Sequence, residues 1–220
     1  MNYILSNPDV TVATIAGHIG QAQAVGSVLL LLSGGSNISL EVEVLKQLSS
    51  LDNLSVGLID ERYGAVGHPA SNWQQLLSAG FKPEQVKSLP VLQGLDLSQT
   101  VTAYNQTLAD AVQSHNNVIG VFGIGTDGHT SGILPNSPAV TSEQLVTSYK
   151  AADYERITTT PISMYLFDQA FLIAYGEQKY LALDNLSLEL SIAEQPAQAL
   201  KFAKHLTIYN DQIGPDGADL

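Results

Sequence analysis

Short apolar segments alternate along the chain with longer amphipathic segments, and this alternation restricts the fold more than any other feature of the sequence. Strands are expected at the apolar segments, residues 28–32, 54–59, 118–122, 170–174 and 206–209. Most of them are apolar on both faces, as strands in the middle of a parallel sheet are. Helices are expected where apolar residues recur at helical spacing, at residues 39–48, 72–77, 99–114, 162–167, 177–185 and 197–204. The alternation predicts a three-layer α/β fold, a mostly parallel twisted sheet with helices on both faces.

The domain organisation follows from the length. A chain of 220 residues suits one α/β domain and is short for two. No repeat, low-complexity segment or charge block marks a linker, so residues 1–220 are expected to form a single domain. Residues 211–220 contain two Gly, one Pro and three Asp without apolar periodicity, and a flexible tail is expected there.

The composition disfavours several classes of function. Nine Lys and Arg against 21 Asp and Glu give a net charge of −12, which argues against nucleic acid and anionic membranes as partners. The absence of Cys excludes disulfides, thiolate catalysis and cysteine-bound metals. Residues 1–10 lack the basic start and long apolar stretch of a signal peptide, and residues 28–32 fall far short of the roughly 20 residues of a membrane helix. A cytoplasmic location is expected.

The turn Ser33-Gly34-Gly35-Ser36-Asn37 follows the strand expected at 28–32 and leads into a helix. Ligands of open parallel sheets bind beyond the carboxyl ends of the strands, so such turns are informative. Glycines let backbone N–H groups approach a ligand, and a helix N-terminus favours an anion. The alternative is that Ser and Asn cap the helix while the glycines only form the turn.

A second polar turn, Asp60-Glu61-Arg62, follows the strand expected at 54–59, and Ser71-Asn72 begin the next helix. It brings two carboxylates and a guanidinium to the edge of the sheet, and thereby acid, base and anion-binding groups to one place. The alternative is a surface ion pair at the end of the strand.

The third turn, residues 123–132, reads GIGTDGHTSG and contains the GxGxxG pattern of dinucleotide-binding proteins. Asp127 would place a carboxylate beside a pyrophosphate, and Pro135 and Pro138 interrupt the helix that should hold it, so we reject dinucleotide binding. His129 suits a general base near neutral pH, since the unperturbed pKa of an imidazole is about 6.5. The alternative is a loop histidine that binds only backbone groups.

Together these turns resemble the motifs of the 6-phosphogluconolactonase family, which shares a superfamily with the glucosamine-6-phosphate deaminases and isomerases. The family patterns LSGGSTP, DER with a following SN, and GxGxDGHTASxFP are similar to residues 32–38, 60–62 with 71–72, and 123–135. Later segments, 156–160, 176–179 and 196–200, resemble RITLT, GxxK and PAxxL. The resemblance covers most of the chain and implies the Rossmann-like fold of that superfamily.

The activity that the resemblance implies is hydrolysis of 6-phospho-D-glucono-1,5-lactone to 6-phosphogluconate in the oxidative pentose phosphate pathway, without a metal or a cofactor. In this interpretation His129 activates water, and Asp127 is a candidate to orient its imidazole. Backbone N–H groups of residues 34–35 or 125–128 would stabilise the oxyanion. The expected partner is a small phosphorylated sugar lactone, and the protein is expected to be a monomer or weak homodimer.

A phosphate dianion requires local cations in so acidic a chain. The only two arginines, Arg62 and Arg156, both fall inside family motifs. Arg156 and Lys179, with Ser36 and the N–H groups at the helix start, form the expected phosphate site, whereas Arg62 either binds phosphate or holds the loop near Asp60. The expected substrate-binding residues are Gly34, Gly35, Ser36, Asn37, Asp60, Arg62, Arg156 and Lys179.

Departures from the family pattern keep two rival functions open. Asn37 and Ile38 replace a Thr-Pro pair, from which an altered affinity is expected before a loss of activity. An amino-sugar phosphate deaminase or isomerase would resemble this chain through Asp60 and the third turn. The pattern that this group looks like has a carboxylate five positions after the histidine, and Leu134 stands at that position here. The other rival is a non-catalytic sugar-phosphate-binding protein, against which the presence of the Asp127–His129 pair speaks.

Overall fold

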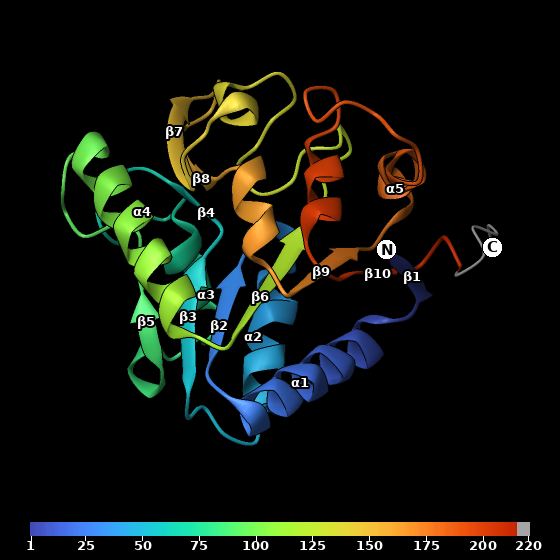
Figure 1. The fold of residues 1–220 in the computed structure, drawn as a ribbon, viewed down its shortest axis with the longest axis horizontal. Coiled ribbons are helices and arrows are strands. Elements are labelled where there is room, and N and C mark those ends of the chain that lie inside the picture. Colours follow the sequence, from blue (N-terminus) through green and yellow to red (C-terminus); the bar gives the residue numbers. More distant parts are fainter. Residues whose placement is uncertain (215–220) are drawn as a thin grey trace.

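The computed structural model describes residues 1–214, and its main element is a seven-stranded sheet (Figure 1). The strands are ordered β1-β10-β9-β6-β2-β3-β5, and every neighbouring pair is parallel. They comprise β1 (Asn2–Leu5), β2 (Val28–Leu32), β3 (Leu54–Leu58), β5 (Lys87–Leu89), β6 (Asn117–Gly123), β9 (Gln169–Ala174) and β10 (Leu206–Asn210). The predicted α/β fold with a mostly parallel sheet is confirmed.

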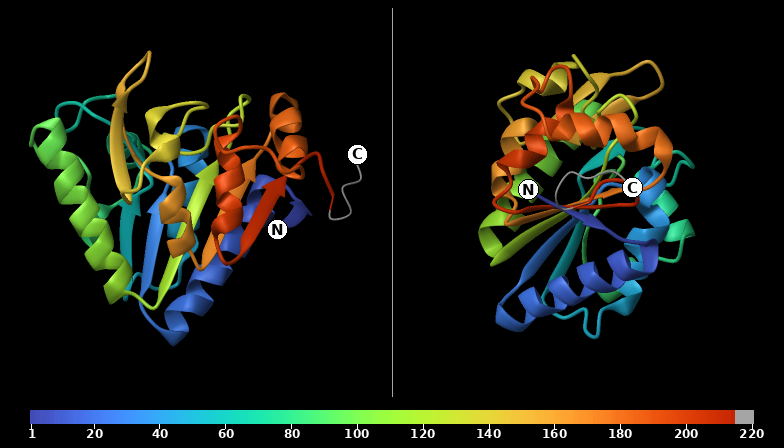
Figure 2. Two further views of the ribbon diagram at one scale, coloured as in Figure 1. Left: turned by 45° about the horizontal axis from the view of Figure 1, so that its top comes forward. Right: turned by 90° about the vertical axis from the view of Figure 1, so that its right-hand side faces the viewer.

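Helices cover both faces of this sheet. They are α1 (Pro8–Val25), α2 (Ile38–Gln47), α3 (Asn72–Ser78), α4 (Leu97–Ser114) and α5 (Tyr180–Leu186). The right-hand view of Figure 2 shows α1 on one side of the sheet and the short helices of the C-terminal half on the other. All residues of β2 and β3 are buried, because both faces of these central strands are covered.

Two segments expected to be α-helices are 3₁₀-helices instead, η4 (Pro161–Leu166) and η6 (Pro196–Phe202). A third expected helix is divided into η5 (Glu177–Lys179) and α5. Proline at the first helical position suits both kinds of helix, and in segments this short the spacing of apolar residues does not distinguish a period of 3.0 from one of 3.6. Short 3₁₀-helices η1 (Gly35–Asn37), η2 (Pro83–Gln85) and η3 (Pro138–Thr141) complete the helical elements.

Helix α1 was not expected from the sequence. Its start is well defined, because the side chain of Asn7 accepts a hydrogen bond from the N–H of Val10 at 3.0 Å and Pro8 occupies the first helical position. Its buried residues are Thr11, Val12, Ile15, Ala16 and Ile19. Gly17 and Gly20, which have low helix propensity, obscured this pattern.

A small antiparallel sheet, ordered β4-β8-β7, lies beside the main one. It consists of β4 (Asp60–Arg62), β8 (Glu155–Thr159) and β7 (Val146–Lys150). Residues 60–62, expected as a turn, are therefore a strand. Its pairing with β8 places Asp60 opposite Thr158 and Arg62 opposite Arg156.

Residues 211–214, the start of the segment expected to be a flexible tail, are attached to the rest of the fold. The carboxylate of Asp211 accepts a hydrogen bond from the N–H of Gly176 at 3.1 Å, and Ile213 is buried. Residues 215–220, the remainder of that segment, lie outside the described residues. In the described part of the chain, no helix combines the length and apolar character needed to cross a membrane.

Candidate active site

The candidate site lies where the strand order of the main sheet reverses. From β2 the chain continues through β3 to β5 on one side, whereas from β6 it continues through β9 to β10 on the other. The carboxyl ends of the neighbouring strands β2 and β6 therefore border a crevice of the kind that binds ligands in open α/β sheets. The first and third turns leave from these two strand ends.

An open pocket of about 270 Å³ occupies this crevice. It is lined by Ser33, Gly34, Gly35, Ser36, Asp60, Arg62, Asn72, Gly123, Ile124, His129, Ser131 and Arg156. All three turns predicted from the sequence contribute to it, and β8 adds Arg156. Of the expected site residues, Asp127, Asn37 and Lys179 do not line the pocket themselves.

The side chains of His129 and Asp127 are in direct contact, with 2.6 Å between Nδ1 and Oδ1. The backbone N–H of His129 donates to the same carboxylate oxygen at 3.1 Å. Burial alone would raise the pKa of Asp127, but these hydrogen bonds and the nearby imidazole outweigh it and lower that pKa. Because an ionised carboxylate only accepts, Nδ1 carries the proton, and Nε2 of the neutral ring is left as an acceptor.

The third turn is closed by its own backbone. The N–H of Gly125 donates to the carbonyl of His129 at 2.8 Å, and the N–H of Gly128 donates to the carbonyl of Gly125 at 3.0 Å. These two N–H groups are therefore not free for the oxyanion role considered from the sequence. A Cβ atom at Gly125 would overlap the imidazole of His129 and the carboxylate of Asp127, so a side chain there would force these groups to move.

In the first turn, Gly34 and Gly35 adopt φ angles of 77° and 64°, which favour glycine. The N–H groups of Ser33 and Gly34 are bonded to the carboxyl group of Glu41, a buried residue that the sequence analysis did not single out. Within residues 1–214, the N–H groups of Gly35 and Ser36 have no hydrogen-bond partner. These two are the donors that the turn offers to a ligand.

Asn37, expected to bind substrate, has a structural role in this arrangement. It is buried, and its Nδ2 donates to the carbonyl oxygens of Phe122 at 3.1 Å and Ile173 at 3.4 Å. The amide thereby ties the turn after β2 to the ends of β6 and β9. The sequence could not separate this role from ligand binding, because an amide suits both.

Asp60 and Glu61 have different surroundings. Burial, and after it the neighbouring charge of Glu61, raises the pKa of Asp60 to about 7, although Arg156 and Arg62 act in the opposite direction. Glu61 accepts hydrogen bonds from the N–H groups of Asn72 at 2.6 Å and Trp73 at 3.1 Å, and so caps helix α3. Only Asp60 of the two lines the pocket.

Among the described residues, each arginine guanidinium donates one hydrogen bond to the protein, and its other N–H groups remain available to a ligand. Nη1 of Arg62 donates to the carbonyl of Ala70 at 3.0 Å, and Nη2 of Arg156 donates to Asp153 at 2.7 Å. The guanidinium of Arg62 also lies 5.5 Å from the ring centre of Tyr154. In both arginines Nε is buried and has no partner among the described residues. Buried donors are normally satisfied, so this concentration of unpaired donors at one pocket suits an anion.

Lys179 reaches the pocket through Ser36, with 3.4 Å between its Nζ and the Oγ of Ser36. Burial lowers the pKa of Lys179, and the charge of Asp211 partly offsets this effect. Lys179 thus lies at the rim, next to the first turn.

No metal site accompanies these residues. Over residues 1–214, no three His, Asp or Glu side chains are grouped so that they could hold a metal ion. The donors described above are cationic or neutral, which suits an anionic ligand.

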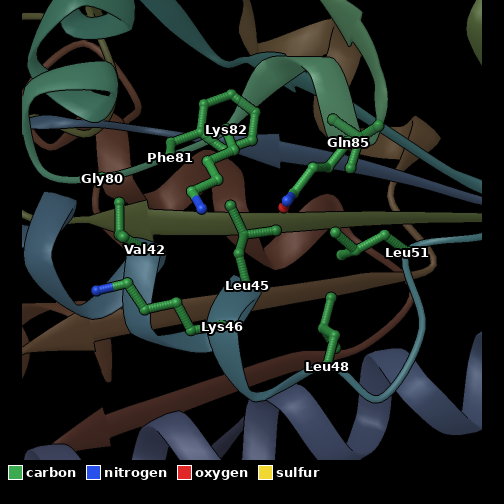
Figure 3. A pocket seen from close by; sticks show the side chains of 10 residues that line it. Val42, Leu45, Lys46, Leu48, Leu51, Gly80, Phe81, Lys82 and Gln85 are labelled. Carbon is green, nitrogen blue, oxygen red and sulfur yellow. The ribbon is translucent and has the colours of Figure 1, made fainter.

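A second pocket, of about 360 Å³, lies away from the three turns, between the C-terminal half of α2 and residues 80–86 (Figure 3). Its lining is largely apolar and includes Leu45 and Phe81, together with the lysines Lys46 and Lys82. No carboxyl group, imidazole or hydroxyl lines it, so it lacks the groups needed for hydrolysis.

The chain is similar in sequence to curated 6-phosphogluconolactonases. The chain is 27% identical over 189 residues to a 6-phosphogluconolactonase of Synechocystis, covering 80% of this chain and 78% of the relative. It is 26% identical over 197 residues to a 6-phosphogluconolactonase of Helicobacter pylori, covering 82% and 81%.

Solved structures share the fold. The crystal structure of a 6-phosphogluconolactonase from Shewanella baltica has a TM-score of 0.80 at 19% identity, covering 96% of this chain and 97% of that one. A monomeric glucosamine-6-phosphate deaminase has a TM-score of 0.76 at 18% identity, with the same coverage of 96% and 97%. The family model described as glucosamine-6-phosphate isomerases/6-phosphogluconolactonase matches residues 9–209. This match extends over nearly the whole described chain, and the protein belongs to that family.

Proposed function

We propose that the protein hydrolyses 6-phospho-D-glucono-1,5-lactone to 6-phosphogluconate. One observation carries this proposal: a histidine bonded to a carboxylate opens onto the same pocket as both arginines of the chain. A base and an anion site in one crevice are what hydrolysis of a phosphorylated ester requires. The names of the relatives in Synechocystis and Helicobacter pylori point to the same reaction.

The proposed reaction begins at His129. Its Nε2 accepts a proton from a water molecule while the water oxygen bonds to the lactone carbonyl carbon. Asp127 keeps the proton on Nδ1 and stabilises the imidazolium that forms. The bond between the carbonyl carbon and the ring oxygen then breaks, and Nε2 returns its proton to that oxygen, which becomes a hydroxyl group.

The phosphate is assigned to the cationic side of the pocket. Arg156, Lys179 and the hydroxyl of Ser36 are its proposed ligands, together with the free N–H groups of Gly35 and Ser36 at the start of the helical segment. Arg62 faces the same pocket and adds positive charge next to Asp60.

The test is the decay of freshly generated lactone, followed with the purified protein and a metal chelator. Decay faster than the spontaneous rate is expected. A rate equal to the spontaneous one, with 6-phosphogluconate still bound, would instead identify a non-catalytic sugar-phosphate-binding protein.

A second candidate function is deamination of an amino-sugar phosphate. It is favoured by Asp60, a buried carboxyl group at the pocket whose pKa of about 7 suits proton transfer near neutral pH. Leu134 argues against deamination, because it stands where the deaminase pattern has a carboxylate. Release of ammonia from glucosamine 6-phosphate, without faster lactone decay, would reverse the assignment.

A further inference from the structure

A buried carboxyl group lies directly behind the first turn and has no part in the proposed chemistry. Glu41 belongs to the first turn of α2 and is 0% exposed. No basic side chain in the described residues forms an ion pair with it. A carboxyl group buried in this way is costly unless its oxygens accept hydrogen bonds.

Among residues 1–214, the groups that donate hydrogen bonds to Glu41 all belong to the turn. Its Oε1 accepts from the N–H of Ser33 at 2.9 Å, from the hydroxyl of Ser33 at 3.0 Å and from the N–H of Gly34 at 3.3 Å. Its Oε2 accepts from the N–H of Gly34 at 3.2 Å. One side chain therefore satisfies three donors of two consecutive residues.

Asn72 holds the opposite side of the same turn. Its Nδ2 donates to the carbonyl of Ser33 at 3.2 Å, and a Cβ atom at Gly34 would lie 2.7 Å from the Cγ of Asn72. Ser33 and Gly34 are thus fixed from two directions. The next two N–H groups, those of Gly35 and Ser36, remain without partners in the described part of the chain.

We propose that Glu41 is a positioning residue for the phosphate subsite: by binding the N–H groups of Ser33 and Gly34, it orients the turn so that the N–H groups of Gly35 and Ser36 meet the ligand. This inference rests on the proposed function. It assigns a role to a residue that touches neither the substrate nor the reacting atoms.

The protonation state of Glu41 agrees with this role. Burial, and to a smaller extent the charge of Asp60, raises the pKa of Glu41 to about 8, although the hydrogen bonds from Ser33 and Gly34 oppose the shift. The raised pKa reduces the negative charge that this carboxyl group places behind an anion site.

The experiment compares four variants in lactone hydrolysis and in calorimetric binding of 6-phosphogluconate. Glu41→Leu removes the acceptors and is expected to raise KM and the product Kd about 10-fold, with kcat changed less than about 3-fold. Glu41→Gln retains an acceptor oxygen and is expected to restore both constants to within about 3-fold of the wild type. Glu43→Gln, a matched change of an exposed residue on the same helix, is expected to leave both unchanged.

Glu41→Asp keeps the carboxyl group but shortens its reach to Ser33, and it should resemble Glu41→Leu. If Glu41→Leu does not fold, Glu41→Asp tests whether Glu41 positions the turn. A fall in kcat at constant KM, or wild-type KM in both Glu41→Leu and Glu41→Asp, would overturn the proposal.

Failure of the proposed function is distinguishable from failure of this inference. If the wild type neither hydrolyses the lactone nor binds 6-phosphogluconate, amide hydrogen exchange of residues 33–36 becomes the readout. Faster exchange in Glu41→Leu than in Glu41→Gln would still support the positioning of the turn by Glu41. Equal exchange in the two variants would overturn it.

Discussion

Arg62 and Arg156 lie directly opposite each other on the antiparallel strands β4 and β8. Like charges in this position repel, and each guanidinium is held by a different acceptor, the carbonyl of Ala70 or the carboxylate of Asp153. Both also act on the buried Asp60. An anion bound in the pocket that they share would reduce the repulsion, and this supports the proposal that the pocket binds the phosphate.

Replacement of Arg156 by Ala tests this assignment. We expect KM for the phosphorylated lactone to rise about 10- to 100-fold, because a charge-assisted hydrogen bond to the phosphate is lost. The KM for an unphosphorylated gluconolactone should change little, since that substrate has no group for Arg156 to bind. Steady-state kinetics with both lactones measures the difference.

The control for the loss of positive charge is Lys204→Ala. Lys204 is exposed and lies 3.8 Å from Asp168, its partner in an ion pair remote from the pocket. This variant should retain the wild-type KM for both substrates. A similar rise in KM for both lactones in Arg156→Ala would remove Arg156 from the phosphate site.

The proposed base is tested with His129→Ala. The loss of a positioned base is expected to lower kcat by about 10²- to 10⁴-fold, while binding of 6-phosphogluconate is retained. His205→Ala, which removes an exposed imidazole outside the pocket, serves as the matched control. Near-wild-type turnover of His129→Ala would refute the assignment of the base.

Much of the fold could be predicted from the sequence because its central strands are apolar on both faces. The segment 28–32 is an example, and the order of motifs after such strands placed three turns at one edge of the sheet. The small sheet could not be predicted in this way. The segment 60–62 is short and consists of charged residues. It forms a strand only because β8, which is distant in the sequence, pairs with it.

Roles that depend on where a side chain points could not be predicted from the sequence either. Asn37 was expected to face the ligand, but its amide bonds to the carbonyl groups of two strand ends. Glu41 was not singled out because a carboxylate on a helix is usually exposed. It is buried because the turn before α2 folds back onto it.

The buried carboxyl groups predict how stability depends on pH. The pKa of Glu41 is raised from 4.5 to about 8, so the folded state binds a proton that the unfolded state has released. This contribution to stability is complete below about pH 4.5 and is lost as the pH rises through about 8. Asp60, with its pKa raised to about 7, acts in the same direction.

We therefore expect the free energy of unfolding of the wild type to fall between about pH 4.5 and about pH 8. Glu41→Gln, which cannot ionise, should show a shallower fall over the same interval. Urea unfolding at several pH values measures both slopes. Identical slopes would mean that Glu41 titrates normally in the folded protein.

The close approach of residue 125 to the side chains of His129 and Asp127 leads to the last prediction. In Gly125→Ala the added methyl group would overlap the ring of His129 and the carboxylate of Asp127, so the ring must move. We expect kcat to fall at least about 10-fold with a small change in KM, because the base is displaced while the phosphate ligands stay in place. Gly20→Ala, in open space on α1, is the matched control and should retain full activity. Wild-type kcat in Gly125→Ala would mean that the ring of His129 does not lie against residue 125 when the lactone is hydrolysed, and the proposed pairing with Asp127 would then not be the catalytic arrangement.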